Sequence, residues 1–388
     1  MNESQPISEK EAINLKDSAP KERIVWIDIA RGFVIVYMII TLTFDHAWFS
    51  GSLLLQFLFV HPSRVPGSMH LVDLGAPAFV MLLGILLGVT FQRRKQQDGV
   101  KKALLHIVYR YGLVVVLGII ILLASWDFKF MHERYDRFLN DGVTNINVFI
   151  SDVIFVLGMV GFIALPFLFV NKKYRLLPAY GLILFYSIML ILNDYTMWIN
   201  DAVSSVHLGI WFGIFGYGPI TIIATTLGEY MFMEKSPSPN LYLNLGFFGV
   251  ANLGLGLVLA QTSYLFIIGG LLIAIGGSIL GMFLFIFVEK HFKYRLHLFE
   301  AYGKYPFLVY LAVALPWEIH KLLVDNGVLP PFGLTGLIIA ITVFWVLLTG
   351  VVYLLYFKKK RVKTEWVAIA TFGIVIIVVL IAWPLGWL

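Results

Sequence analysis

The chain consists of long apolar stretches separated by short polar ones, a pattern typical of a helical membrane protein. A helix needs about 20 mainly apolar residues to cross the hydrocarbon core of a bilayer. Stretches of this kind occur at 26–44, 71–91, 103–124, 149–170, 176–193, 208–232, 241–260, 264–288, 303–322, 333–357 and 366–386. The pattern therefore predicts an all-α, polytopic membrane helix bundle of about eleven transmembrane helices.

The basic residues predict the orientation of this bundle, because Lys and Arg concentrate in cytosolic loops. With the N-terminus in the cytosol, 22 of the 29 Lys and Arg residues fall in segments on the cytosolic side. The largest groups lie at 93–102, 172–175 and 358–363. An error of one span would reverse the later loops and destroy this asymmetry. We therefore expect residues 1–24 to form a cytosolic tail and residues 25–388 to form one transmembrane domain.

The composition agrees with this interpretation and excludes some kinds of chemistry. Hydrophobic residues make up 59% of the chain and charged residues only 13%, against about 25% charged in soluble domains. The chain has no cysteine, which excludes disulfides, thiolate metal sites and a thiol nucleophile. The net charge of +6 does not indicate a nucleic-acid partner, since the basic residues lie in short loops between apolar stretches.

Ionisable residues inside the apolar stretches are candidate functional groups, because a charge within the bilayer needs a partner or water. Asp28 and Arg31 open the first stretch and stand three residues apart, which places them on one helical face. They can form an interfacial ion pair, or the guanidinium can bind an anionic cytosolic ligand such as a nucleotide-bearing acyl donor. Arg110 lies at a similar depth in the third stretch and is a second candidate for such a ligand.

The outer ends of the first two stretches are rich in groups suited to acid–base chemistry. Asp45 and His46 end the first stretch, and Asp73 begins the second, close to His70. An aspartate that pairs with a histidine fixes its tautomer and raises its basicity, which suits a general base near neutral pH. His61 lies in the same segment, so three histidines are candidates for the base. Their spacing matches no zinc signature, and we expect no metal.

The stretch 264–288 contains a run of glycines, which has two interpretations. Its members are Gly269, Gly270, Gly276, Gly277 and Gly281. Small residues at this spacing let helix backbones approach closely, which favours packing. The alternative is that they border a passage for a substrate.

The order of these residues resembles the transmembrane acyltransferases related to heparan-α-glucosaminide N-acetyltransferase. The similar segments are R-x-x-x-I-D-x-x-R-G at 23–32, D-L-G-A-P-A-F at 73–79 followed by Gly84, the arginine and glycine of the third stretch, and G-K-Y-P-F-L-V-Y at 303–310. The family also has eleven spans. Most of the resemblance lies in the first 120 residues or so.

The resemblance implies an enzyme that moves an acyl group, in the family acetyl, from cytosolic acyl-coenzyme A to a hydroxyl or amine of an extracytoplasmic sugar or glycolipid. The site residues that it implies are His46, Asp45, Asp73 and His70 for catalysis and Asp28, Arg31 and Arg110 for the acyl-coenzyme A (acetyl-CoA) co-substrate. Direct attack by the acceptor and a covalent acyl-histidine both remain open. Either route requires a water-accessible passage from the level of Arg31 to His46.

The expected partners are the lipid bilayer, acyl-CoA and the outer acceptor, with a homodimer left open, and the expected location is the cytoplasmic membrane of a prokaryote. A transporter or lipid flippase would use the same buried charges as a pathway, although no inverted repeat stands out in the sequence. An inactive membrane scaffold is the third alternative. Two departures from the family pattern favour it, Ser63 in place of a histidine ten residues before Asp73 and Leu42–Thr43 in place of an asparagine.

Overall fold

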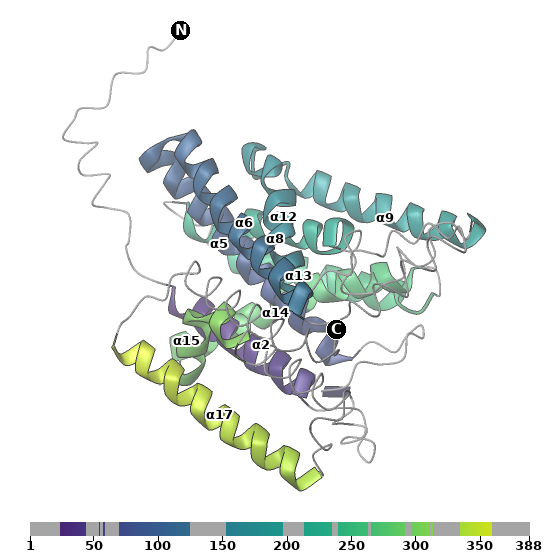
Figure 1. Ribbon diagram of the computed structural model, residues 1–388. Helices are drawn as coiled ribbons and strands as arrows, with labels where there is room; N and C mark the ends of the chain where they lie inside the picture. The colour runs from purple at the N-terminus through teal and green to yellow at the C-terminus, as the bar shows by residue number, and fades with distance from the viewer. Residues whose placement is uncertain are drawn as a thin grey trace, which may run out of the picture.

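The computed structural model describes residues 24–43, 54, 57–58, 70–124, 153–196, 213–234, 240–262, 265–291, 296–310, 312 and 334–358, and these residues are almost entirely helical (Figure 1). The α-helices are α2 (Val25–Thr43), α5 (Gly75–Asp98), α6 (Val100–Ala124), α8 (Val153–Ala164), α9 (Leu176–Thr196), α12 (Gly218–Phe232), α13 (Leu241–Leu259), α14 (Phe266–His291), α15 (His297–Lys304) and α17 (Leu334–Phe357). Short 3₁₀ helices form η1 (Leu71–Leu74) and η3 (Pro166–Phe169), and a short π-helix forms η4 (Gly213–Tyr217).

The predicted all-α class is confirmed for the described residues, and most helices lie where apolar stretches were expected. Four helical segments are long and apolar enough to cross a membrane: Gly75–Asp98, Val100–Ile119, Leu241–Leu259 and Ile267–His291. The expected stretch 366–386 lies outside the described residues, and 303–322 is described only in its first part. The fold is thus consistent with an integral membrane protein.

The structure differs from the prediction at the segment 92–102, which was expected to be a cytosolic loop. The helix α5 continues to Asp98 and α6 begins at Val100, so a single residue, Gly99, connects them. Its φ of 84° lies in the left-handed region that glycine adopts without steric cost. The polar residues before it are Gln, Arg and Lys, which are strong helix formers, so the helix continues after the apolar pattern has ended.

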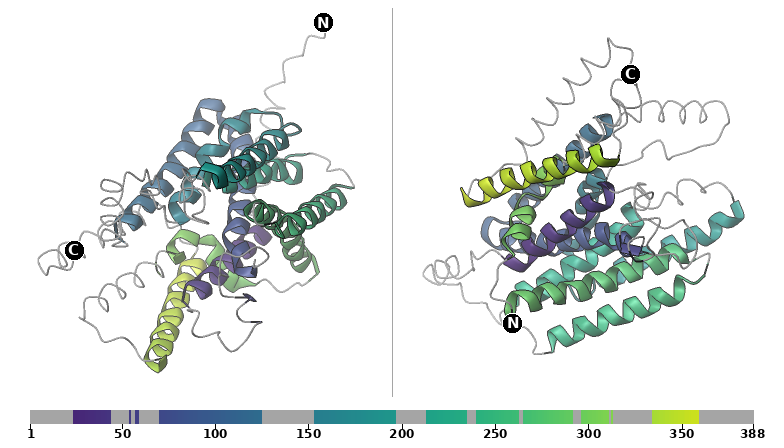
Figure 2. Two further views of the ribbon diagram at one scale, coloured as in Figure 1. Left: turned by 90° about the vertical axis from the view of Figure 1, so that its right-hand side faces the viewer. Right: turned by 90° about the horizontal axis from the view of Figure 1, so that it is seen from below.

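Contacts between helix ends show that neighbouring helices run in alternate directions. The ring of Trp26, at the start of α2, stacks on Phe232 at the end of α12, with centroids 6.3 Å apart. Lys290, near the end of α14, lies 5.2 Å above the ring of Tyr242 at the start of α13. Seen from below, α17, the pair α2 and α15, then α14 and α13 follow one another across the bundle (Figure 2).

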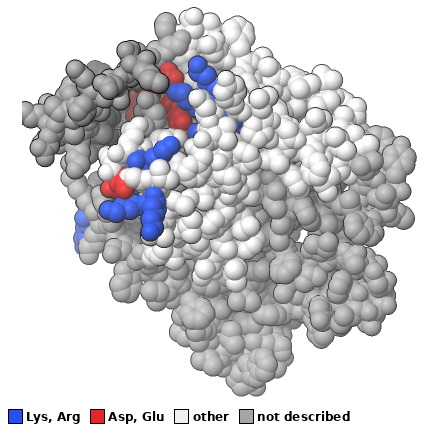
Figure 3. Space-filling model, turned by 90° about the horizontal axis from the view of Figure 1, so that it is seen from above, with Lys and Arg blue, Asp and Glu red and all other residues white. Residues whose placement is uncertain are grey.

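Charged side chains are concentrated in one part of the bundle. Every Lys and Arg among the described residues belongs to a segment, or to the half of a stretch, that was expected on the cytosolic side. From above, the coloured side chains gather toward one edge of the face, and the rest of the described surface there is white (Figure 3). On this face the basic groups therefore lie close to one another.

Two glycines allow α2 and α15 to cross with their backbones in contact. A Cβ atom added to Gly32 would overlap the carbonyl oxygen of Phe299, and one added to Gly303 would overlap the carbonyl oxygen of Asp28. Since a backbone oxygen cannot rotate away, neither position accepts a side chain without separating the helices.

We expect Gly303→Ala to lower the free energy of unfolding by about 1–3 kcal/mol, the usual cost of forcing extra volume into a packed interior. The matched control is Gly350→Ala on α17, where an added Cβ meets nothing within 4 Å. Thermal unfolding of the detergent-solubilised proteins measures both effects. Equal unfolding temperatures for the two variants would contradict the close crossing.

Candidate functional site

The ion pair of Asp28 and Arg31 lies buried where α2 crosses α15. Nη1 of Arg31 is 3.6 Å from Oδ1 of Asp28, and its Nη2 donates a 2.7 Å hydrogen bond to the carbonyl oxygen of Gly303. Less than a tenth of either side chain is exposed. The last carbonyls of a helix lack partners within it and attract a cation, so the guanidinium fastens the end of α15 to α2. The two groups do share one face of α2, as their spacing predicts.

Arg110 occupies a different environment from Arg31. Its side chain is exposed on α6, and α6 packs chiefly against α8 and α5. Arg31 is buried between α2 and α15 instead. The two arginines were expected to contact one ligand, and that joint contact stays a prediction.

Asp73 and His70 form a capped turn at the opposite end of α2 from Arg31. The backbone N–H of His70 donates a 2.9 Å hydrogen bond to Oδ2 of Asp73, and the N–H of Asp73 donates a 3.2 Å bond to the carbonyl oxygen of His70. The imidazole of His70 lies beside the ring of Phe57, with centroids 5.7 Å apart. The Asp73 carboxylate thus holds the turn that begins α5, a backbone role that the expected pairing with an imidazole did not include.

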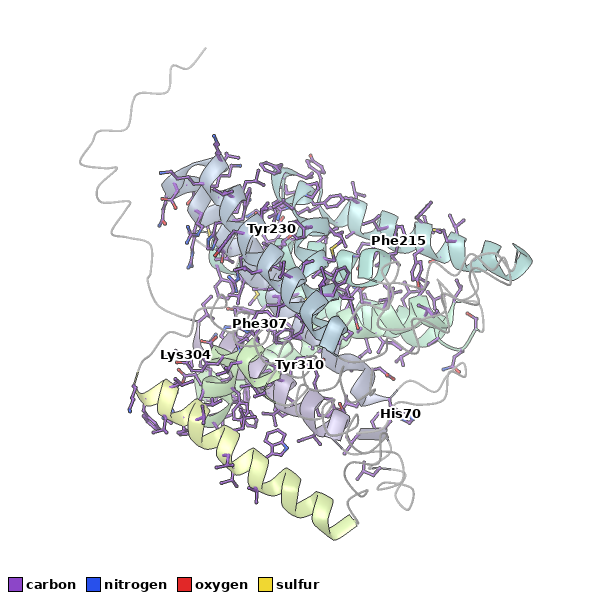
Figure 4. All side chains as sticks on the ribbon, viewed as in Figure 1. His70, Phe215, Tyr230, Lys304, Phe307 and Tyr310 are labelled. Atoms are coloured by element: carbon purple, nitrogen blue, oxygen red, sulfur yellow. The ribbon has the colours of Figure 1, made fainter. Side chains whose placement is uncertain are left out.

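The outer half of α2 packs next to this turn. The Tyr37 hydroxyl donates a hydrogen bond to the carbonyl oxygen of Leu58, and a Cβ added to Gly75 would lie 3.2 Å from Met38. His70 and Lys304 appear at opposite sides of the bundle in Figure 4.

Three other predicted site residues, Asp45, His46 and His61, lie outside the described residues. Their pairing with Asp73 therefore stays a prediction.

A cavity of about 190 Å³ lies between α2, the η1–α5 segment and α14. Its α2 wall is formed by Ala30, Phe33, Val34 and Tyr37, which share one helical face. Among all its lining side chains only Tyr37 and Ser278 carry a polar group. The cavity extends between the levels of Arg31 and Asp73, but its lining is apolar. This lining is not the polar one that the passage expected along this face would have, and the passage itself stays a prediction, because His46 lies outside the described residues.

The glycines of α14 divide between two faces. An added Cβ would overlap Ala260 at Gly269 and the carbonyl oxygen of Gly249 at Gly276, so both glycines permit close packing with α13. Gly277 and Gly281 face away from that interface and line the cavity. The packing interpretation is thus confirmed for Gly269 and Gly276, and the substrate passage stays a prediction for the other face.

A second buried charge cluster joins α5, α9 and α12. Nη1 of Arg175 lies 2.7 Å from Oε1 of Glu229 and 3.2 Å from Oγ1 of Thr225, to which it donates. Its Nε and Nη2 donate to the carbonyl oxygen of Val170 at 3.1 and 3.0 Å. Nε2 of Gln92 donates a 3.0 Å bond to the same Glu229 oxygen. The exposed fractions of the Arg175 and Glu229 side chains are 1% and 8%, so this cluster holds three segments together in the interior of the bundle.

Sequence reasoning placed Arg175 in a cytosolic loop and did not identify its partner. Glu229 lies near the end of the apolar stretch 208–232. A buried carboxylate requires a cation, and several basic groups were expected on the same side of the bundle as Glu229. The sequence does not show which of the three basic residues at 172–175 turns inward, because this depends on the tertiary packing of η3.

The fold and the site together define a helical bundle with a buried ion pair at one end of α2, a carboxylate at the other, and an apolar cavity between them. Neither a family model nor a curated protein sequence matches the chain. The resemblance to transmembrane acyltransferases therefore rests on the segments named under "Sequence analysis".

Proposed function

We propose that this protein is a membrane-bound acyltransferase that uses cytosolic acyl-CoA, with acetyl the expected acyl group, and an acceptor at the outer side. The observation that carries the proposal is the placement of polar groups at both ends of α2. Arg31 and Asp28 lie at one end, and Asp73 lies beside the other. One helix thus connects a basic group suited to an anionic donor with a carboxylate suited to orienting a base.

The topology that the proposal requires is a bundle of about eleven spans with a cytosolic N-terminus. The alternating directions of the described helices and the basic groups at their shared end support this arrangement. Arg31 then lies on the cytosolic side, where acyl-CoA is available, and Asp73 lies on the outer side. The location that follows is a prokaryotic cytoplasmic membrane.

The chemistry proposed at the outer end is proton removal during acyl transfer. His46, oriented by Asp45 or Asp73, takes the proton of the acceptor hydroxyl or amine as that group attacks the thioester carbonyl. The new C–O or C–N bond forms as the C–S bond breaks, and the leaving thiolate receives the proton. An acyl-histidine intermediate would divide the same exchange into two steps. No metal takes part in either route.

We expect Arg31→Lys to weaken acetyl-CoA binding about tenfold, or about 1.4 kcal/mol, because a lysine cannot reproduce the forked hydrogen bonds of a guanidinium. The readout is the rise in unfolding temperature with acetyl-CoA, measured against the ligand-free temperature of each variant. Arg94→Lys is the matched control, since Arg94 also forms a 3.6 Å ion pair with an aspartate but is 40% exposed.

Arg110→Lys tests whether the exposed arginine of α6 also contacts the donor. A loss equal to that of Arg31→Lys would place both arginines at the ligand. The proposed function fails if acetyl-CoA stabilises none of the proteins and no acyl transfer to any glycolipid occurs.

A lipid flippase is the second candidate, and the apolar lining of the cavity favours it. A flippase would move a labelled lipid across liposomes without acyl-CoA, whereas the acyltransferase would modify the lipid only when acyl-CoA is supplied. Lipid movement without modification would therefore replace the first proposal with the second.

A further inference from the structure

We propose that the cavity between α2, α5 and α14 binds the hydrocarbon chain of a single-chain lipid whose hydroxyl-bearing head lies at the Asp73 end. The inference rests on the proposed function only in making this lipid the acyl acceptor. Apart from two hydroxyls, the lining is apolar. Such a lining suits part of an alkyl chain, because moving CH₂ groups from water into apolar surroundings is favourable.

The two hydroxyls of the cavity lie at one end of it. Tyr37 is the outermost α2 residue of the lining, and it lies beside Gly75. A Cβ added to Gly277 would lie 3.3 Å from the side chain of Leu74, which brings its neighbour Ser278 to the same level. Asp73 precedes Leu74 in η1. The cavity therefore becomes more polar toward Asp73 and is entirely apolar toward Ala30.

Ser278 supplies independent evidence for a ligand at the polar end. Ser278 is 7% exposed, and its buried hydroxyl has no hydrogen-bond partner among the described residues. A helical serine or threonine ordinarily donates to the carbonyl one turn earlier. The other buried hydroxyls of this kind do so, in Ser187, Thr221, Thr225 and Thr226. A buried hydroxyl without a partner is costly, and an ether or ester oxygen between the head and the chain of a lipid would satisfy it.

The walls of the cavity also suit a chain that enters from the bilayer. Phe33 and Leu71 line the cavity and are 45% and 38% exposed, so the cavity reaches the surface of the bundle. Gly281 has nothing within 4 Å of an added Cβ, which leaves space along α14. The amide-bearing arm of acyl-CoA is a poorer occupant, because only Tyr37 and Ser278, both at one end, could bond its amides, and the rest of the lining is apolar. We therefore assign the cavity to the acceptor.

The test uses the full-length protein in detergent with a photoreactive probe, a hexadecyl glucoside that carries a diazirine in the middle of its chain. Labelled peptides are identified by mass spectrometry. We expect labelling of peptides from α2 and α14, and we expect Gly281→Leu to reduce it at least tenfold by filling the cavity. Gly254→Leu is the matched control, because Gly254 also has open space around an added Cβ but lies on the exposed face of α13.

Ser278→Ala reports on the polar end. We expect it to weaken competition by unlabelled hexadecyl glucoside up to about tenfold, the equivalent of one hydrogen bond. It should leave the competition by hexadecane unchanged, because hexadecane has no group for the hydroxyl to bind.

The outcomes separate this inference from the proposed function. The lipid site is overturned if Gly281→Leu does not reduce the labelling. It is also overturned if acetyl-CoA abolishes the labelling as the glucoside does, and this second result assigns the cavity to the donor. Labelling that follows the expected pattern supports the lipid site. If acetyl is then not transferred to the glucoside, the acyltransferase fails while the lipid site stands.

Discussion

Replacing Glu229 by leucine should lower the free energy of unfolding by about 3–5 kcal/mol, because it leaves a buried guanidinium without its counter-ion. Arg175 is 1% exposed, and Glu229 is its only carboxylate partner among the described residues. Its remaining hydrogen bonds, to Thr225 and to backbone carbonyls, solvate the cation but do not neutralise it. The loss should be larger than for any packing change at the glycine crossing of α2 and α15.

The double variant Arg175→Met/Glu229→Leu separates the lost charge pair from lost packing. We expect it to recover most of the stability, since a buried pair replaced by apolar groups of similar size is often neutral or stabilising. The control is Lys172→Met, which removes a 2.6 Å pair with Glu234 whose side chains are 24% and 29% exposed. An exposed pair contributes about 0.2–1 kcal/mol. Unfolding in denaturant measures all three variants, and a double variant as unstable as Glu229→Leu would contradict the account.

Helix positions could be predicted from this sequence because the thickness of the bilayer sets the length of each apolar stretch. The stretch 241–260, for example, is α13 almost residue for residue. The junction of α5 and α6 was missed because the end of an apolar stretch marks where the helix leaves the lipid. It does not mark where the backbone hydrogen bonds of the helix end. Polar helix formers continue α5 to Asp98, and only the left-handed Gly99 stops it.

The candidate site could be predicted only where it depends on local spacing. Asp28 and Arg31 share a face because three residues is nearly one helical turn, and this holds in any fold that keeps the helix. The inward position of Arg175 and the cavity next to Ser278 depend instead on how distant helices cross. The crossing of α5 and α12 is set by Gly84, Gly88 and Gly228, and the sequence alone does not reveal which glycines meet.

The apolar cavity changes how the two ends of α2 can cooperate. A polar passage would let one extended donor contact Arg31 and the outer site together. An apolar cavity keeps water away from this face and allows a lipid to bring its own hydroxyl to Asp73 from within the bilayer. The acceptor would then be concentrated in the membrane, and the protein would need to bind its chain more than its head.

Replacing His46 by alanine should reduce acyl transfer by about 10²–10⁴-fold, the usual contribution of a positioned general base. His46 follows Thr43, the last residue of α2, by three residues, and three extended residues span about 10 Å at most. The outer half of α2 packs beside η1, so we expect the imidazole to reach the end where Asp73 lies. Transfer of labelled acetyl from acetyl-CoA to a glycolipid measures the effect.

His70→Ala is the decisive control for that measurement. The Asp73 carboxylate accepts a hydrogen bond from the backbone N–H of residue 70, which alanine also provides, so this substitution should leave the carboxylate in place. Activity that survives His70→Ala but not His46→Ala assigns the base to position 46. The reverse result would move the base into the turn that begins α5. Mass spectrometry of the protein with acetyl-CoA and no acceptor then separates the two routes, because only an acyl-histidine adds an acetyl group to the peptide that contains the base.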